Sequence, residues 1–574
     1  MTAPAVVQPH PEESSSSPRP WRDVPASFAA EVLRVGDQRE LIDSIIRTLS
    51  AKQQKLLMHP AGGLAAVLTP IQPGERVLVL GVPNSTLPSA IASFGASVTC
   101  ADWEPARLRF ARLLCEPALG GSWLELAPGG SLPFAVGAFD VVITDLDELR
   151  SASPDGRLEA ALAEIGRVVS TDGTIVLATS SRVARWRSTD PRELIRALRS
   201  PWWSSAIRTA GFASQRVLVP YPSRRNWHWM IPLERLREPF GEKVEVTNRR
   251  TALIRGWKLL ARLGLGRWIA RDFYVVARRS DDPSATPDTM TDTLEACAGE
   301  RTPLLLSLSD ARIAVLGEKR FVKVPLSRHQ QEALVSEVHN TELARSTGLA
   351  DHVLSGSRVR DHAGVPVTDF PLVVADDSCE EDPQAAIVRI CRTLPADRRL
   401  PLADTAFWTR LVSAHGVDET SAVGADGHRA RVLAEFGALQ VPVGPTHGDL
   451  HPGNLMYVDR FALLVDWNRF ELTNPLFFDP LYALVIERQK RLGTDLATEL
   501  IAFAEGRTTG ALTELADERL GELTREQAAV ILLLDRAVSY GESRRLSRPW
   551  TLERFADAAR RFDERFAARG SSTH

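Results

Sequence analysis

Four short apolar segments, separated by longer stretches, constrain the fold of the first half of the chain most strongly. They are Arg76–Gly81, 96–102, 139–145 and 173–178. Short runs of Val, Ile and Leu are typical of strands that are buried on both faces of a parallel sheet. The stretch 157–168 between the last two has helical periodicity. This alternation predicts an open, doubly wound α/β sheet of Rossmann-like type.

The second half of the chain has a different pattern. Segments 311–316 and 320–324 flank Gly-Glu-Lys and predict an antiparallel hairpin. We expect a helix over 330–343, a further strand over 371–375, and mostly helices beyond Asp404. A small sheet-rich lobe followed by a larger helical lobe is the α+β layout of two-lobed, kinase-like folds.

The length of 574 residues is too great for one hydrophobic core. We predict a disordered Ser/Pro-rich tail over 1–25 and the α/β domain over 26–279. A polar linker rich in turn-forming residues would follow over 280–302, and the kinase-like domain would occupy 303–570.

Composition excludes several classes of protein. A net charge of −3 gives no general attraction for nucleic acid, and we expect no nucleic-acid partner. The five cysteines form no CxxC pair, which argues against a zinc site or a disulfide framework. No run of about 18 apolar residues is present, and the N-terminus does not have the pattern of a signal peptide. We therefore predict a cytoplasmic protein, at most peripheral to the inner face of the membrane.

Residues suited to phosphoryl transfer lie in segment 447–454 and at Asp466. Such a transfer needs a carboxylate that positions the acceptor hydroxyl, and oxygen ligands for magnesium. Asp449 and Asn454 are five residues apart, as in the kinase catalytic loop. Asp466 ends an apolar segment. We predict Asp449 as the catalytic base, and Asn454 and Asp466 as magnesium ligands.

Lysine is rare in this chain: it accounts for seven of the 69 basic residues. Lys323 lies within a predicted strand and would contact the α- and β-phosphates of ATP. Glu337, on the following helix, would hold Lys323 as an ion pair, with Glu332 as a competitor on the same helix. His447 and His451 are expected to anchor the loop through backbone hydrogen bonds.

These residues resemble the aminoglycoside phosphotransferase and choline kinase family. The family motifs present are His-Gly-Asp-Leu-His-Pro-Gly-Asn at 447–454, Asp466–Trp467 and Asp479–Pro480. The resemblance covers roughly 303–570 and implies ATP, Mg²⁺ and a hydroxyl acceptor. The chain departs from the family at Asn468, where an acidic residue is common, and no glycine-rich loop is found in 307–316.

The order of elements in 70–180 resembles the class I S-adenosylmethionine-dependent methyltransferases, as does Leu132-Pro-Phe134 followed by 139–142. This resemblance implies a glycine turn at Gly81 and binding of the ribose hydroxyls by Asp102, with S-adenosylmethionine as cofactor. Four positions depart from the family: Val79, Pro83, Ser85 and Pro128. A working methyltransferase and a domain that only binds or scaffolds both stay open.

Segment 249–271 contains seven basic residues and no acidic one. Its apolar residues Ile254, Trp257, Ala261 and Leu265 share one helical face. Two interpretations are open: a solvated basic face on a packed helix, or peripheral contact with an anionic membrane or glycolipid.

The overall layout is similar to that of bifunctional enzymes that cap bacterial surface polysaccharides with phosphate and methyl groups. Our leading hypothesis is an ATP- and magnesium-dependent phosphotransferase acting on a hydroxyl of a small molecule or glycan. The alternatives are an antibiotic-modifying phosphotransferase and a scaffold protein with a catalytically dead methyltransferase-like domain. Aminoglycosides are polycations, so the acidity of the site around Asp449 distinguishes the first two.

Overall fold

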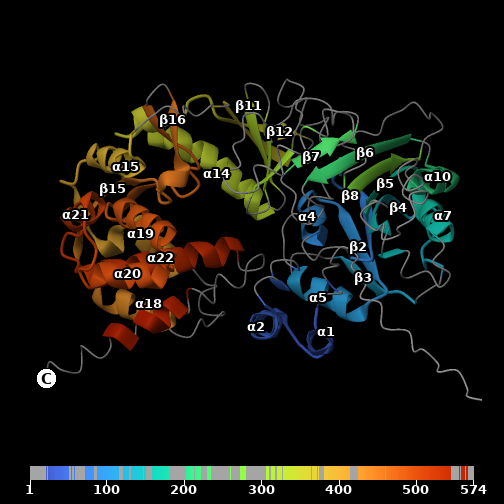
Figure 1. Cartoon of the computed structure of the whole chain (residues 1–574), viewed down its shortest axis with the longest axis horizontal. Coiled ribbons are helices and arrows are strands. Elements are labelled where there is room, and N and C mark those ends of the chain that lie inside the picture. Colours follow the sequence, from blue (N-terminus) through green and yellow to red (C-terminus); the bar gives the residue numbers. More distant parts are fainter. Residues whose placement is uncertain are drawn as a thin grey trace, which may run out of the picture.

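The computed structural model is described for only part of the chain. The described residues are principally 21–57, 71–149, 158–180, 202–233, 270–279, 305–371, 381–413, 425–544 and 555–566, with short gaps inside several of these ranges. Figure 1 shows the first half of the chain, in blue to green, beside the helical C-terminal part, in orange to red.

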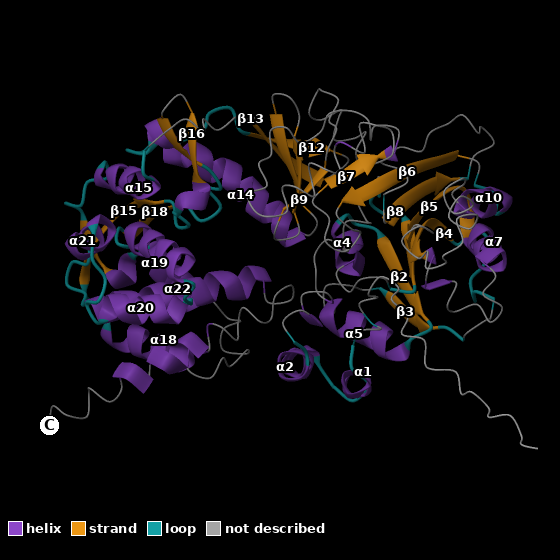
Figure 2. Ribbon diagram, viewed as in Figure 1, coloured by secondary structure: helices purple, strands orange, loops and turns teal. Residues whose placement is uncertain are grey.

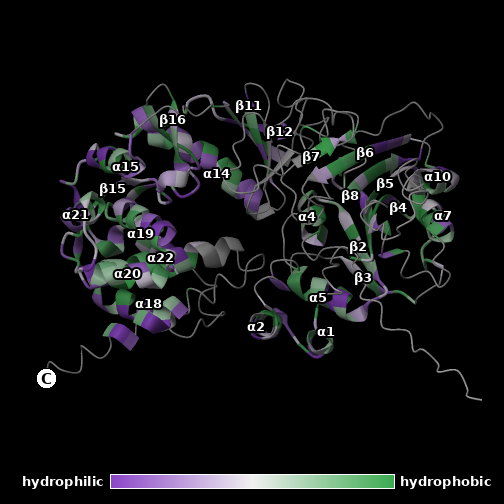
Figure 3. Ribbon diagram, in the orientation of Figure 1, coloured by the Kyte–Doolittle hydropathy of each residue, from purple (hydrophilic) through white to green (hydrophobic). Residues whose placement is uncertain are grey.

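A mixed sheet forms the centre of the first half. Its strands, in spatial order, are β3 (Ser122–Glu125), β2 (Ser97–Asp102), β1 (Arg76–Leu80), β4 (Phe139–Asp145), β5 (Val169–Ser180), β8 (Asp272–Arg278), β6 (Ser214–Tyr221) and β7 (Trp229–Pro232). The first five are parallel to one another, and β8 pairs antiparallel with both β5 and β6. Figure 3 shows hydrophobic residues along its central strands.

Helices cover both faces of this sheet. One buried cluster includes Leu87 of α4 (Leu87–Ser93) and Leu108 of α5 (Pro105–Cys115). A second includes Leu162 of α7 (Leu158–Val168) and Ile207 of α10 (Trp202–Thr209). Two further helices, α1 (Ala26–Val32) and α2 (Gln38–Thr48), contact α5. The predicted doubly wound, Rossmann-like α/β fold is confirmed.

The second half begins with a five-stranded antiparallel sheet. In spatial order its strands are β9 (Leu305–Leu308), β10 (Arg312–Leu316), β11 (Arg320–Pro325), β13 (Val365–Pro371) and β12 (Arg358–His362). Helix α14 (Arg328–Arg345) contacts β11 and β13. We call β9 to β13 together with α14 the small lobe. The strand predicted at 371–375 is instead β13, which ends at Pro371, because a Val/Thr/Phe-rich stretch precedes that proline.

The two sheets are continuous. Strand β7 pairs antiparallel with β9 through Trp229–Leu306 and Met230–Leu305, so a single 13-stranded sheet spans both halves (Figure 2). Val322 and Val324 of β11 belong to the same buried cluster as Met230. Since side chains alternate along a strand, Lys323 between those two valines faces the opposite side, toward α14.

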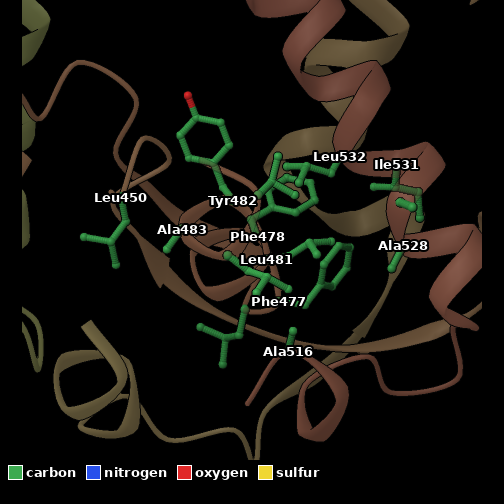
Figure 4. Close-up of a cluster of buried hydrophobic side chains, with 14 of the residues drawn as sticks. Leu450, Phe477, Phe478, Leu481, Tyr482, Ala483, Ala516, Ala528, Ile531 and Leu532 are labelled. Carbon is green, nitrogen blue, oxygen red and sulfur yellow. The ribbon is translucent and has the colours of Figure 1, made fainter. Parts of the chain in front are cut away.

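The C-terminal lobe is mainly helical. Its elements are β14 (Arg399–Pro401), β15 (Gln440–Thr446), β16 (Leu455–Val458), β17 (Phe461–Leu464) and β18 (Glu471–Pro475), with helices α15 (Pro383–Arg392), α16 (Ala406–Ser413), α18 (Ala425–Glu435), α19 (Phe478–Leu492), α20 (Leu496–Ala504), α21 (Ala511–Glu518) and α22 (Arg525–Arg544). Figure 4 shows the core between α19 and α22, where Phe477, Leu481 and Ile531 are fully buried. This two-lobed arrangement confirms the predicted α+β kinase-like class.

Several sequence predictions fall outside the described residues. They include residues 1–20 of the tail predicted over 1–25, most of the basic segment 249–271 and the linker 280–302. Pro83, Ser85 and Pro128 lie outside as well. Within the described part of the chain, no helix is both long and apolar enough to cross a membrane.

Candidate functional site

The loop between β15 and β16 is anchored by Asp479 at the start of α19. The Asp479 carboxylate accepts hydrogen bonds from the backbone N–H groups of His447, at 2.7 Å, and Gly448, at 2.9 Å. Gly448 has φ +76°, and a Cβ there would lie 2.2 Å from the carbonyl oxygen of Arg469. Only glycine fits this close approach in the left-handed region.

Asp449 and Asn454 face each other across this loop. The Asn454 Nδ2 donates to the Asp449 carbonyl oxygen at 2.9 Å and lies 3.4 Å from the Asp449 Oδ2. The turn is closed by His451, whose Nδ1 accepts the Gly453 N–H at 2.9 Å. The predicted loop-anchoring hydrogen bonds of His451 are therefore present, and the two predicted catalytic-loop residues lie together.

Positive charge surrounds Asp449. The buried Arg536 of α22 donates from Nη1 to the Asp449 Oδ1 at 3.3 Å and from Nη2 to the Gly448 carbonyl oxygen. Its guanidinium lies 3.8 Å from the centre of the Tyr482 ring. Burial raises the pKa of Asp449, but the charges of Arg469 and Arg536 outweigh that effect and lower the pKa to about 2. Asp449 is therefore ionised at neutral pH and can only accept hydrogen bonds.

Asp466 follows β17 in a strained backbone conformation. Among the described residues other than glycine it alone has a positive φ, of +68°. Such a conformation costs energy for a residue with a Cβ and is characteristic of functional sites. Its Oδ1 lies 3.4 Å from the Lys323 Nζ and accepts a hydrogen bond from Asn468 Nδ2.

Lys323 of β11 and Glu337 of α14 form a buried ion pair. The Lys323 Nζ lies 2.5 Å from the Glu337 Oε1, and the two side chains are 10% and 2% exposed. Glu332, the competing acid on the same helix, is exposed. The predicted Lys323–Glu337 pair is confirmed. Lys323 therefore connects the small lobe to Asp466 in the C-terminal lobe.

The catalytic loop and the Asp466 loop are held together by His447 and Trp467. His447 Nδ1 accepts the Asp449 N–H at 3.3 Å, so Nε2 carries the proton and donates to the Val465 carbonyl oxygen at 3.0 Å. The His447 and Trp467 ring centres are 4.7 Å apart. Asn340 of α14 donates to the Trp467 carbonyl oxygen at 3.0 Å. The predicted structural role of His447 agrees with these contacts.

The donor set suits magnesium bound together with a nucleotide. Asp466 offers a carboxylate and Asn454 an amide oxygen, both hard ligands of the kind that Mg²⁺ prefers. Among the described residues, no cluster of three or more His, Cys, Asp or Glu side chains is arranged to hold a metal. Mg²⁺ in kinase sites commonly takes its remaining ligands from phosphates and water, so this two-residue set fits.

Sequence reasoning missed the residues that position Asp449. Asp479 was noted only as part of a motif, although it accepts two loop N–H groups. Arg536 lies 87 residues beyond Asp449 in a helix with no local motif, and only the tertiary structure identifies it. Arg469, three residues after Asp466, had a weak signal: it is a cation beside a predicted metal ligand.

The two residues predicted to hold S-adenosylmethionine also lie side by side. Gly81 follows β1, has φ +68° and donates its N–H to the Ala101 carbonyl oxygen at 2.8 Å. Asp102 ends the neighbouring strand β2. Both Asp102 carboxylate oxygens accept hydrogen bonds from Arg107 of α5, each at 2.7 Å. Arg107 was not singled out in the sequence.

A protein-family model matches part of the second half of the chain. Residues 385–510, which include Asp449, Asn454 and Asp466, match the model of the phosphotransferase enzyme family. An uncharacterized protein of Mycobacterium tuberculosis is 28% identical over 162 residues, which is 28% of this chain and 52% of that protein. An uncharacterized protein of Mycobacterium bovis gives the same values. The chain thus spans about half the length of the curated relatives that it matches.

Solved methyltransferase structures align with part of this chain. The S-adenosylmethionine-dependent methyltransferase of Mesorhizobium loti is 18% identical, with 39% of this chain and 100% of that chain covered and a TM-score of 0.26. Phosphoethanolamine N-methyltransferase 2 of Haemonchus contortus, in complex with S-adenosylmethionine, is 16% identical, with 43% and 61% covered and a TM-score of 0.26. The strand order of the first sheet, rather than these scores, carries the fold assignment. The chain combines a Rossmann-type α/β fold with a segment, residues 385–510, that matches the phosphotransferase enzyme family.

Proposed function

We propose that the second half of the chain transfers the γ-phosphoryl group of ATP to a hydroxyl of a small molecule or glycan. The observation that carries this proposal is the placement of Lys323. Its ammonium group lies between Glu337, at 2.5 Å, and Asp466, at 3.4 Å, where it would contact the phosphates of a nucleotide. A solvated lysine on the protein surface would not be fixed between two carboxylates in this way.

In this proposal the chain's own groups orient the reactants. Asp449, ionised because of its low pKa, accepts a hydrogen bond from the acceptor hydroxyl and directs its oxygen at the phosphorus. Arg536 fixes the orientation of Asp449. Asn454 and Asp466 would hold magnesium, which when bound neutralises charge on the phosphate oxygens.

The charges around Asp449 favour one class of acceptor. The two cations that lower the pKa of its carboxylate most are Arg469 and Arg536. Lys490 is a further cation, which acts on the pKa of His451. A polycationic aminoglycoside would be repelled here, whereas a neutral or anionic sugar would not. We therefore favour a glycan or small-molecule hydroxyl over an antibiotic as the acceptor.

A turnover assay tests this function. The full chain with Mg²⁺ and ATP would be assayed against neutral sugars, acidic glycans, glycolipids and aminoglycosides, with Asp449→Asn as the inactive control. We expect acceptor-dependent ADP release and a phosphorylated sugar. Turnover with aminoglycosides alone would contradict the acceptor class, and failure of the wild-type chain to bind Mg-ATP would contradict the function itself.

A further inference from the structure

The edge of the first sheet at which a cofactor would bind is closed by the chain's own side chains. Asp102, predicted to grip the ribose hydroxyls, has a side chain that is 0% exposed. Arg107 takes both of its oxygens at 2.7 Å, and Oδ1 also accepts the Glu104 N–H at 2.8 Å. A ribose could reach this carboxylate only by displacing the guanidinium.

Displacing Arg107 would be unfavourable. Its Nη1 also lies 2.8 Å from Glu148, and the Arg107 and Glu148 side chains are only 13% and 16% exposed. Without Asp102, a nearly buried cation would keep a single partner, which is the costly way to break such a network.

The space beside the glycine turn is occupied as well. A Cβ placed on Gly81 would lie 3.1 Å from the Trp103 ring and 3.5 Å from the Glu148 Cβ. In dinucleotide- and nucleoside-binding folds this glycine lets a ligand approach the backbone. Here the residue that follows Asp102 fills that position with an indole ring.

The far edge of the same sheet has a different neighbour, the small lobe. Met230 of β7 is fully buried and pairs with Leu305 of β9. It shares a buried cluster with Val322 and Val324, the residues on either side of Lys323. Strand β11 therefore has Lys323 on the face toward Glu337, and its other face packs in an apolar layer that includes residues of the first half.

We propose that the first half is a cofactor-independent scaffold for the small lobe. Arg107 holds Asp102 where a ribose would bind, and the sheet continuing through β7 supports the strand that carries Lys323. In this proposal the first half does not transfer methyl groups, so the protein is not bifunctional. The support that the first half gives to the strand carrying Lys323, the nucleotide part of this proposal, rests on the proposed function. The closed site at Asp102, the Asp102 part, does not.

The Asp102 part is tested on the full chain by calorimetry with S-adenosylmethionine and S-adenosylhomocysteine, and by thermal unfolding of Asp102→Asn. We expect no binding of either ligand up to about 1 mM, and a fall of several degrees in the unfolding temperature. Asp140→Asn is the matched control, because Asp140 pairs with Arg76 on the same sheet but both side chains are partly exposed. It should change the unfolding temperature much less.

Two results together would overturn the scaffold assignment. The wild-type chain would bind either ligand with a submillimolar dissociation constant, and Asp102→Asn would weaken that binding without changing the unfolding temperature. If Asp102→Asn fails to fold, the titration of the wild-type chain is sufficient as a test. Tight binding of either ligand by the wild-type chain would contradict the closed site directly.

The nucleotide part is tested with Met230→Ala and Ile207→Ala, both fully buried but in different clusters. Both truncations destabilise the protein. Met230→Ala should weaken Mg-ATP binding about tenfold, while Ile207→Ala, in the cluster on the other face of the sheet, should leave it unchanged. Equal effects of the two variants would overturn the supporting role. Absence of Mg-ATP binding by the wild-type chain would instead contradict the phosphotransferase, and the Asp102 titration would still stand.

Discussion

Lys323 Nζ lies 2.5 Å from Glu337 Oε1, and this buried pair joins strand β11 to helix α14 in the small lobe. The pair fixes a lysine that is also 3.4 Å from Asp466 in the other lobe. A cation held between two carboxylates is ready to exchange part of this contact for nucleotide phosphates.

The first prediction concerns that pair. Glu337→Gln should lower kcat/KM for ATP by about 10- to 100-fold, because the neutral amide no longer holds the lysine in place. Glu332→Gln, on the exposed side of the same helix, is the control and should leave kcat/KM unchanged. Steady-state kinetics of both variants decides: equal behaviour would show that the ion pair has no role in nucleotide use.

The second prediction separates the metal ligand from the backbone strain at Asp466. Asp466→Ala and Asp466→Gly should both abolish magnesium-dependent ATP binding, since each removes the carboxylate. The glycine variant should be the more stable by about 1 kcal/mol, because glycine adopts a φ of +68° without strain. Calorimetry and chemical denaturation measure the two effects. An unchanged affinity for Mg-ATP in either variant would refute the assignment of the ligand.

The third prediction concerns Arg536 as a positioning residue. Arg536→Lys keeps the charge but loses the paired contacts to Asp449 and the Gly448 carbonyl. We expect kcat to fall about 10- to 100-fold while the dissociation constant for Mg-ATP stays within about twofold. A larger loss of nucleotide affinity than of kcat would indicate a general structural role.

The sequence was sufficient for the parts of the fold and site that depend on local patterns. The short apolar runs of β1 and β4 predicted the sheet type correctly. The motif at 447–454 predicted the loop correctly. Each of these patterns is local in the sequence. Asp102 shows the limit. A carboxylate at the end of β2 has the same sequence signature whether it faces a cofactor or an arginine five residues later in α5. Only the direction of the Arg107 side chain in the folded protein shows that Asp102 pairs with this arginine.

Long-range pairing was likewise beyond sequence reasoning. Nothing in Trp229–Pro232 or Leu305–Leu308 indicates that these two strands pair, since both are short apolar runs with many potential partners. Arg536 contacts Asp449 from a helix far along the chain for the same reason. Tertiary packing, rather than local propensity, sets both contacts.

The fourth prediction concerns pH and Asp369 of β13, a buried carboxylate paired with Arg320, Arg358 and Arg360. Burial raises the pKa of Asp369, but the three arginines outweigh it and lower the pKa overall. The stability that it contributes is thus complete above its unfolded pKa of about 4 and is lost as the pH falls through its lower folded value.

Asp369→Asn should therefore destabilise the protein by about 2 kcal/mol at pH 7, as for lost hydrogen bonds between charged groups, and the difference from wild type should shrink below about pH 4. Urea unfolding at pH 7, 5 and 3 measures this dependence. A stability difference that stays constant across this range would contradict the ion-pair account.

The most direct test of the phosphotransferase assignment is the turnover of Asp449→Asn compared with wild type, using an acceptor found in the turnover assay. Asparagine keeps the size of the side chain but cannot act as the anionic acceptor of the hydroxyl hydrogen bond. We predict that the variant folds, binds Mg-ATP as wild type does, and transfers phosphate about 10²- to 10⁴-fold more slowly. Transfer within tenfold of the wild-type rate would contradict the assignment of Asp449 as the catalytic base.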